Sequence, residues 1–71
     1  MKSVFICKLG TSPLKFILGD TAKVSDLLSA SGITLASGEV VKSVSTEETI
    51  NSNDLLEDEE NYVIVREMKN A

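Results

Sequence analysis

Histidine is absent from this 71-residue sequence, and cysteine occurs once, as Cys7. Without histidine the chain lacks the commonest general base and the commonest side-chain ligand for transition metals. A single cysteine closes no disulfide within the chain and completes no zinc site, so neither kind of crosslink stabilises this short domain. We therefore expect the protein to hold no metal and no cofactor.

Long apolar runs are absent as well. The first apolar stretch, Val4 to Cys7, has four residues, whereas a signal peptide needs about 7–15 and a membrane span about 18. Together with the lone cysteine, this indicates a reducing compartment, and we expect a cytoplasmic protein that does not enter a membrane. Residues 1–71 are short enough to form one domain, which buries only about 60% of its unfolded surface.

Lysine and arginine are missing from residues 43–65, although the chain carries seven of them and has a net charge of −4. Residues 1–42 are slightly basic in contrast. A surface this acidic repels nucleic acid and attracts a basic protein. Six acids are our candidate partner-binding residues: Glu47, Glu48, Glu57, Asp58, Glu59 and Glu60. The alternative is that these residues form a solvated loop that only keeps the protein soluble.

The first eighteen residues predict a β-hairpin. Lys2 to Leu9 is rich in strand-forming residues, and Gly10 to Pro13 is a cluster of turn residues. Leu14 to Leu18 then alternates apolar and other residues, which is typical of an edge strand. Three lysines, Lys2, Lys8 and Lys15, are candidates for protecting that edge against aggregation.

A short helix is expected next. Asp20 or Thr21 offers an N-cap, because either side chain can accept from the free N–H groups of a first turn. An apolar stripe at i, i+3 and i+4 follows, and Gly32 supplies a left-handed C-cap. A helix of about ten residues does not persist alone, so it must lie on the hairpin.

Three further strands are predicted, at Ile33 to Leu35, Val40 to Val44 and Tyr62 to Arg66. Between the last two lies a polar segment, residues 45–61, with Ile50 and the pair Leu55-Leu56 as its apolar anchors. The first and last strands are apolar at consecutive positions, VFIC and YVIV, which indicates central strands. Placing them side by side makes them parallel, with the helix in the crossover. This order, β-β-α-β-(β)-β, predicts an α+β β-grasp (ubiquitin-like) fold with a mixed sheet of four to five strands on one helix.

Three segments carry a family resemblance: TAKVSDLL from Thr21, SGEVV from Ser37, and LEDEENYVIV from Leu56. On these residues the chain resembles, nearly end to end, the small β-grasp sulfur carriers, namely the thiamine-pathway sulfur carrier and the molybdopterin synthase small subunit. The resemblance implies a glycine in the turn before the last strand. Glu59 stands at that place, so we expect a longer turn or one of another type.

The resemblance also implies a Gly-Gly terminus, which a partner enzyme threads through a narrow channel to adenylate its carboxylate. This chain reads Lys69-Asn70-Ala71 instead, and the side chains of Asn70 and Ala71 obstruct such a passage. We therefore expect no sulfur-carrier activity from the sequence as written. A carrier-like protein with a divergent or incomplete C-terminus remains an alternative.

Catalytic chemistry finds little support. Cys7 has no histidine partner and reads as a buried, inert thiol within a strand. The segment from Asn51 to Asp58 lacks the glycine and ligand spacing of a calcium loop. Nothing apolar surrounds the acids to raise a carboxyl pKa. No phosphate-binding or nucleophile motif occurs, and a core this small rarely encloses a pocket, so we expect no enzyme.

The leading hypothesis is therefore a non-catalytic module that binds another protein, through a sheet edge or through the acidic loop at residues 45–61. As an oligomer we expect a monomer, or a weak homo-oligomer formed through a sheet edge. One further alternative is an acidic mimic of nucleic acid, or a regulatory protein, from a phage or mobile element. That alternative requires carboxylates spaced like phosphates along a structured face.

Overall fold

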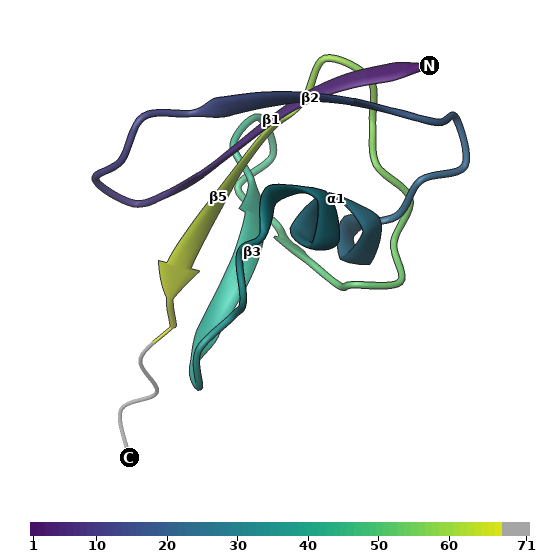
Figure 1. Cartoon of the computed structure of the whole chain (residues 1–71). Helices are drawn as coiled ribbons and strands as arrows, with labels where there is room; N and C mark the ends of the chain where they lie inside the picture. The colour runs from purple at the N-terminus through teal and green to yellow at the C-terminus, as the bar shows by residue number, and fades with distance from the viewer. Residues whose placement is uncertain (68–71) are drawn as a thin grey trace.

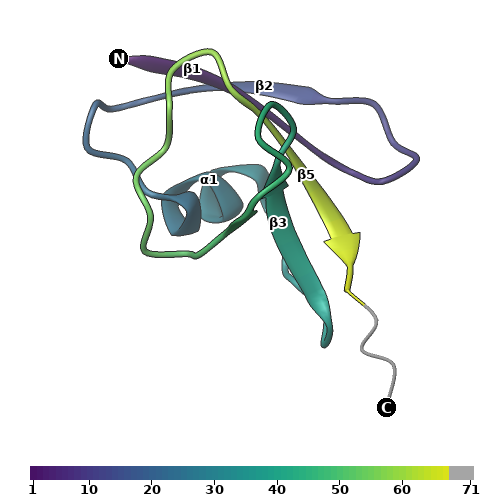
Figure 2. The ribbon, with the colours of Figure 1, turned by 180° about the vertical axis from the view of Figure 1, so that it is seen from behind.

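The computed structural model describes residues 1–67, and these form one mixed sheet packed on one helix (Figures 1 and 2). In chain order the elements are β1 (Lys2–Lys8), β2 (Leu14–Leu18), α1 (Val24–Ser31), β3 (Glu39–Ser43), β4 (Thr49–Ile50) and β5 (Asn61–Arg66). The five strands lie in the order β2-β1-β5-β3-β4. The predicted mixed sheet of four to five strands on one helix is confirmed, and it has five strands. The tail residues on which the sulfur-carrier comparison depends, Lys69-Asn70-Ala71, lie outside the described residues.

The two apolar strands are central and parallel, as predicted. Cys7 of β1 is in register with Val63 of β5. The Leu9 N–H donates to the Ile64 carbonyl at 3.1 Å and continues this ladder beyond the end of β1. A hydrogen-bonded neighbour on each side leaves neither strand with a free edge. The consecutive apolar residues in VFIC and YVIV reflect this central position.

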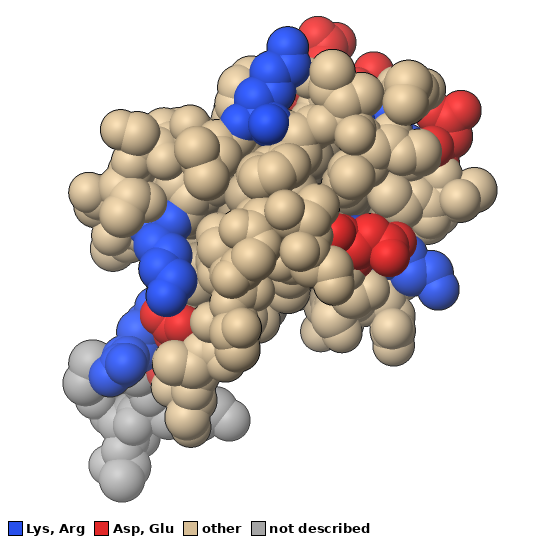
Figure 3. Space-filling model, viewed as in Figure 1, with Lys and Arg blue, Asp and Glu red and all other residues tan. Residues whose placement is uncertain are grey.

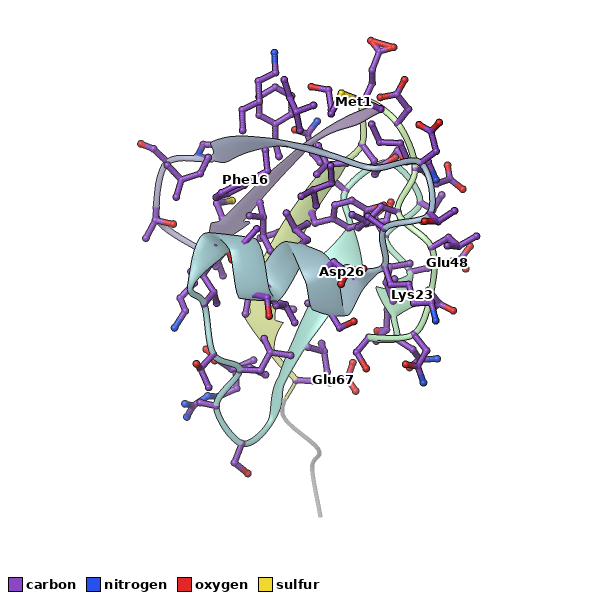
Figure 4. The ribbon with its side chains drawn as sticks, turned by 45° about the vertical axis from the view of Figure 1, so that its right-hand side comes forward. Met1, Phe16, Lys23, Asp26, Glu48 and Glu67 are labelled. Atoms are coloured by element: carbon purple, nitrogen blue, oxygen red, sulfur yellow. The ribbon has the colours of Figure 1, made fainter. Side chains whose placement is uncertain are left out.

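The core lies between the sheet and α1. Val4 and Ile6 of β1 alternate toward the helix, as do Tyr62 and Ile64 of β5, and all four are buried. Leu27 of α1 packs into the same cluster from the other side. Figure 4 shows Phe16 of β2 pointing from the sheet toward the helix. One sheet face and one helix face therefore supply most of the buried apolar area.

Leu55 and Leu56 behave differently, although both were expected to anchor the polar segment. Leu56 is 1% exposed and belongs to the core, whereas Leu55 is 57% exposed. The chain is extended here, with Leu55 in a bridge to Lys23, so consecutive side chains point in opposite directions. Of this pair only Leu56 anchors the segment, and Ile50 packs against the core as the second anchor.

The helix begins later than predicted. Its N-cap is Lys23, not Asp20 or Thr21, and Asp20 instead pairs with the N-terminal ammonium at 2.6 Å. The free N–H groups of the first turn are satisfied by another part of the chain: those of Val24 and Ser25 each donate to a carbonyl of residues 52–54 at 3.0 Å. A loop that is remote in sequence therefore accepts the hydrogen bonds that a capping side chain was expected to accept.

The helix ends as predicted, at Gly32, whose φ of 72° is left-handed. The N–H groups of Gly32 and Ile33 donate to the carbonyls of Ser29 and Leu28, which closes the last turn. The strand expected at Ile33 to Leu35 is wrong, because this segment has no strand partner. Its two apolar side chains pack against the core from an irregular connection. The strand-forming residues Ile33 and Leu35 are therefore partly buried against the core without pairing with another strand.

None of the helices described here has the length and apolar character needed to cross a membrane.

Candidate binding surfaces

The β2 edge is the first candidate surface. β2 pairs with β1 along all five of its residues and has no neighbour on its other side within residues 1–67. Alternate residues of such a strand direct their backbone N–H and C=O groups away from the sheet. Leu14 and Ile17 are 54% and 58% exposed beside these groups. The strand therefore offers unpaired backbone groups flanked by apolar side chains.

Little charge protects this edge. Of the three hairpin lysines, only Lys15 lies on β2. Lys2 and Lys8 lie on β1, where the Lys2 ammonium donates to the Leu56 carbonyl and the Lys8 ammonium is 4.0 Å from a Glu39 carboxylate oxygen. Lys2 and Lys8 therefore contact other parts of the chain and do not protect the β2 edge. One lysine on a five-residue edge leaves room for a partner strand.

A second apolar surface is the open face of the sheet, on the side opposite α1 (Figures 1 and 2). Side chains that alternate with the core residues point to this face. On the three inner strands they include five half-buried residues: Phe5, Cys7, Val40, Val63 and Val65. Cys7 was expected to be buried, so that prediction is wrong in degree: strand alternation puts the thiol on the open face. Ile17 extends the same face onto β2.

The acidic segment is tied to the sheet by Ser3. The Ser3 N–H donates to Asp58 Oδ1 at 2.8 Å, and the Glu59 N–H donates to the Ser3 carbonyl at 2.6 Å. Glu59 adopts a left-handed φ of 62°. The turn before β5 therefore does not avoid the conformation that favours glycine, contrary to our expectation. The two hydrogen bonds to Ser3 extend the pairing of β1 with β5 and hold Glu59 in its left-handed conformation.

Glu60 is bound to a different part of the chain. Its carboxylate accepts from the Ser45 hydroxyl at 2.7 Å and from the Ser45 N–H at 3.2 Å. The Ser45 hydroxyl bond is the main reason why the pKa of the Glu60 carboxyl lies below its ordinary value, although partial burial opposes the shift. Glu60 thus joins the β3–β4 loop to the turn before β5. Asp58 and Glu60 have structural roles, which leaves Glu47, Glu48, Glu57 and Glu59 as the acids of the six whose carboxylates accept no hydrogen bond within residues 1–67.

Part of the acidic segment surrounds a hollow of about 340 Å³, which we call the Tyr62 hollow. It brings together two of the six predicted residues, Glu48 and Glu57, and adds Asp54 from the intervening loop. In the view of Figure 4, Glu48 and Lys23 lie on the same side of the molecule. On the face shown in Figure 3, charged side chains lie mostly toward the rim, and acids gather at the upper right.

Tyr62 is the least exposed of the residues that line this hollow, at 3%. Its hydroxyl accepts the Glu57 N–H at 2.9 Å. Burial raises the pKa of the Tyr62 hydroxyl, and the negative charges of Glu60 and Glu57 raise it further. Sequence reasoning treated Tyr62 only as a strand residue, because nothing in YVIV signals that its polar end meets the acidic loop.

Asp54, which the sequence placed near a rejected calcium loop, has a structural role. Its Oδ2 accepts the Asn51 N–H at 2.9 Å, and its carbonyl accepts the Val24 N–H at the helix start. Among residues 1–67 no group of three or more Asp, Glu or Cys side chains is arranged to hold a metal ion. The geometry of this loop serves helix capping.

Comparison with known proteins places the chain by fold. No protein-family model matches it, and no curated protein matches its sequence. It is similar to a solved structure concerned with molecular mimicry of SUMO that promotes DNA repair, at 18% identity over 90% of this chain and 89% of that one, with a TM-score of 0.63. It is also similar to a chain in the crystal structure of ATBAG1 in complex with HSP70, at 14% identity over 94% of this chain, with a TM-score of 0.64.

The second match spans only 41% of the other chain, so this protein corresponds to less than half of it. At such identities the likeness is one of fold alone. It supports the coarser prediction of a small α+β domain related in fold to ubiquitin-like proteins. Neither structure is described as a sulfur carrier, so the carrier-type resemblance stays a prediction.

Proposed function

We propose that this chain is a ubiquitin-like β-grasp protein that binds another protein without catalysing a reaction. The strand order supports the fold: two parallel central strands, antiparallel strands on both sides, and one helix packed across the sheet. The two structural neighbours support the role, because both come from work on protein recognition, one on mimicry of SUMO and one on a complex with HSP70. The lack of histidine and of nucleophile motifs is the reason to propose no catalysis.

The contact we propose is strand addition at the β2 edge. The observation that carries it is a full-length edge strand with exposed apolar side chains, Leu14 and Ile17, and a single lysine. An extended segment of the partner gains backbone hydrogen bonds from β2, and its side chains pack beside Leu14 on one face of the sheet and beside Ile17 on the other. The partner segment is therefore expected to be an extended, apolar stretch of chain.

The test is affinity capture with three forms of the protein as bait. Leu14→Lys/Ile17→Lys adds two charges at the edge, and Ser29→Lys/Ala30→Lys adds the same two on exposed positions of α1. We expect partners captured by the wild type to be lost or at least tenfold depleted with the edge variant and retained with the helix variant. Circular dichroism establishes that both variants fold. Equal capture by all three folded forms contradicts binding through β2.

A further inference from the structure

The Tyr62 hollow lies at the end of the sheet that carries β3 and β4, away from the β2 edge. Its wall combines two kinds of surface. Ile50 and Leu55 are apolar, and Leu55 is 57% exposed. Three carboxylates, those of Glu48, Asp54 and Glu57, lie around them. A volume of about 340 Å³ is at the low end for a ligand pocket, so it suits one side chain better than a whole cofactor.

The negative charge of the hollow is uncompensated. Within residues 1–67 the ion pairs join the N-terminus to Asp20 and Lys8 to Glu39, so none of the three carboxylates has a cationic partner. Lys23, whose backbone bridges to Leu55, forms no ion pair with them in this part of the chain. Residues 43–65 contain no lysine or arginine of their own.

Tyr62 places a buried polar group in the wall of the hollow. Tyr62 is almost wholly buried, and its hydroxyl accepts the Glu57 N–H but donates to no group in the described chain. Burial raises the pKa of this hydroxyl, and the negative charges of Glu60 and Glu57 raise it further. A cation seated there gains from that potential in a partly water-excluded site.

We propose that the Tyr62 hollow receives one arginine side chain from a partner protein. The methylene stem lies against Ile50 and Leu55, and the guanidinium reaches the carboxylates of Glu48 and Glu57. Arginine fits better than lysine because its planar fork has five N–H donors and is more weakly hydrated than an ammonium. This inference rests on the proposed function only in that the arginine belongs to a bound protein, and it adds a charged contact at the other end of the sheet.

The hollow contains its own probe, since Tyr62 is the only tyrosine and the chain has no tryptophan. The peptide Ac-Gly-Arg-Gly-NH2 is titrated into the full chain while tyrosine fluorescence is recorded, and its citrulline analogue serves as the neutral control. We expect a saturable change in the millimolar range with the arginine peptide and none with citrulline. A non-saturating change, or equal changes with both peptides, overturns the proposal.

Two variants with equal charge locate the effect. Glu48→Gln/Glu57→Gln removes two carboxylates from the hollow, whereas Glu47→Gln/Glu67→Gln removes two exposed carboxylates that do not line it. We expect about tenfold weaker binding for the first and less than twofold for the second. Equal weakening by both shows that only net charge matters and overturns the proposal.

The edge variant Leu14→Lys/Ile17→Lys separates this inference from the proposed function. It is expected to bind the arginine peptide as the wild type does. If the peptide still binds while β2-dependent capture fails, the arginine site at the hollow is supported and partner binding through the β2 edge is not. Loss of peptide binding in this folded variant contradicts an independent site at the hollow.

Discussion

At the scale of single residues, three side chains in one turn show how a general pattern conceals different roles. Asp58 and Glu60 each accept hydrogen bonds from another part of the chain, Asp58 from Ser3 and Glu60 from Ser45. Glu59, between them, is exposed and left-handed. The acids of this turn look alike in the sequence. In the structure Asp58 and Glu60 each have a fixed hydrogen-bond partner, whereas Glu59 has an unfavourable backbone conformation.

Glu59 gives the first prediction. A left-handed backbone conformation costs a residue with a side chain about 1–2 kcal/mol of stability, and glycine avoids this cost. Part of that gain is lost again because glycine has more conformational freedom in the unfolded chain. We therefore expect Glu59→Gly to raise the free energy of unfolding by about 0.5–1 kcal/mol. Urea denaturation of both proteins measures the difference. A loss of stability in the glycine variant would mean that the Glu59 side chain makes a contact worth more than the strain.

Glu60 gives a pH prediction. Because its folded pKa lies below its ordinary value, its charge stabilises the fold above the unfolded pKa of about 4.3. This stabilisation is lost as the pH falls through the lower, folded pKa. We expect Glu60→Gln to be less stable than the wild type at pH 7 and the difference to shrink by pH 3. Chemical denaturation at the two pH values measures it, and a constant difference argues against the Ser45 contact.

At the scale of elements, sequence patterns predicted the features that depend on local burial. They missed the features that depend on contacts between residues far apart in the sequence. VFIC and YVIV predicted the central strands because two buried faces require consecutive apolar residues. Gly32 predicted the helix end because φ above zero favours glycine. The helix start was misplaced because its N–H groups bond to residues 52–54, a long-range contact that no local motif encodes. The Tyr62 hollow was missed for the same reason, as its walls come from separate segments.

The loop that caps α1 gives an element-scale prediction. The Asp54 side chain accepts the Asn51 N–H and so holds the carbonyl that accepts from Val24. We expect Asp54→Ala to lower the free energy of unfolding by about 1 kcal/mol and to speed amide exchange at Val24 and Ser25. Asn53→Ala, at an exposed neighbouring position, is the control and should change stability little. Unchanged exchange at both amides would separate the loop from the helix.

At the scale of the whole molecule, the sheet has two ends with different chemistry. The β2 end has unpaired backbone, exposed apolar side chains and one lysine. The β4 end has the Tyr62 hollow, whose lining includes Glu48, Asp54 and Glu57. A partner that spans both ends would present an extended apolar segment to one and an arginine to the other. Such a division gives strand pairing the larger share of affinity and the charged contact the larger share of selectivity.

The central claim, that a partner adds a strand to β2, is tested most directly by amide hydrogen exchange of the protein alone and bound to a captured partner. Edge amides that point away from β1 exchange readily when free and become protected once a partner strand accepts from them. The account predicts new protection at alternate residues of Leu14 to Leu18, with β1 and β5 unchanged. New protection confined to residues 45–61, with β2 exchanging as before, would contradict it.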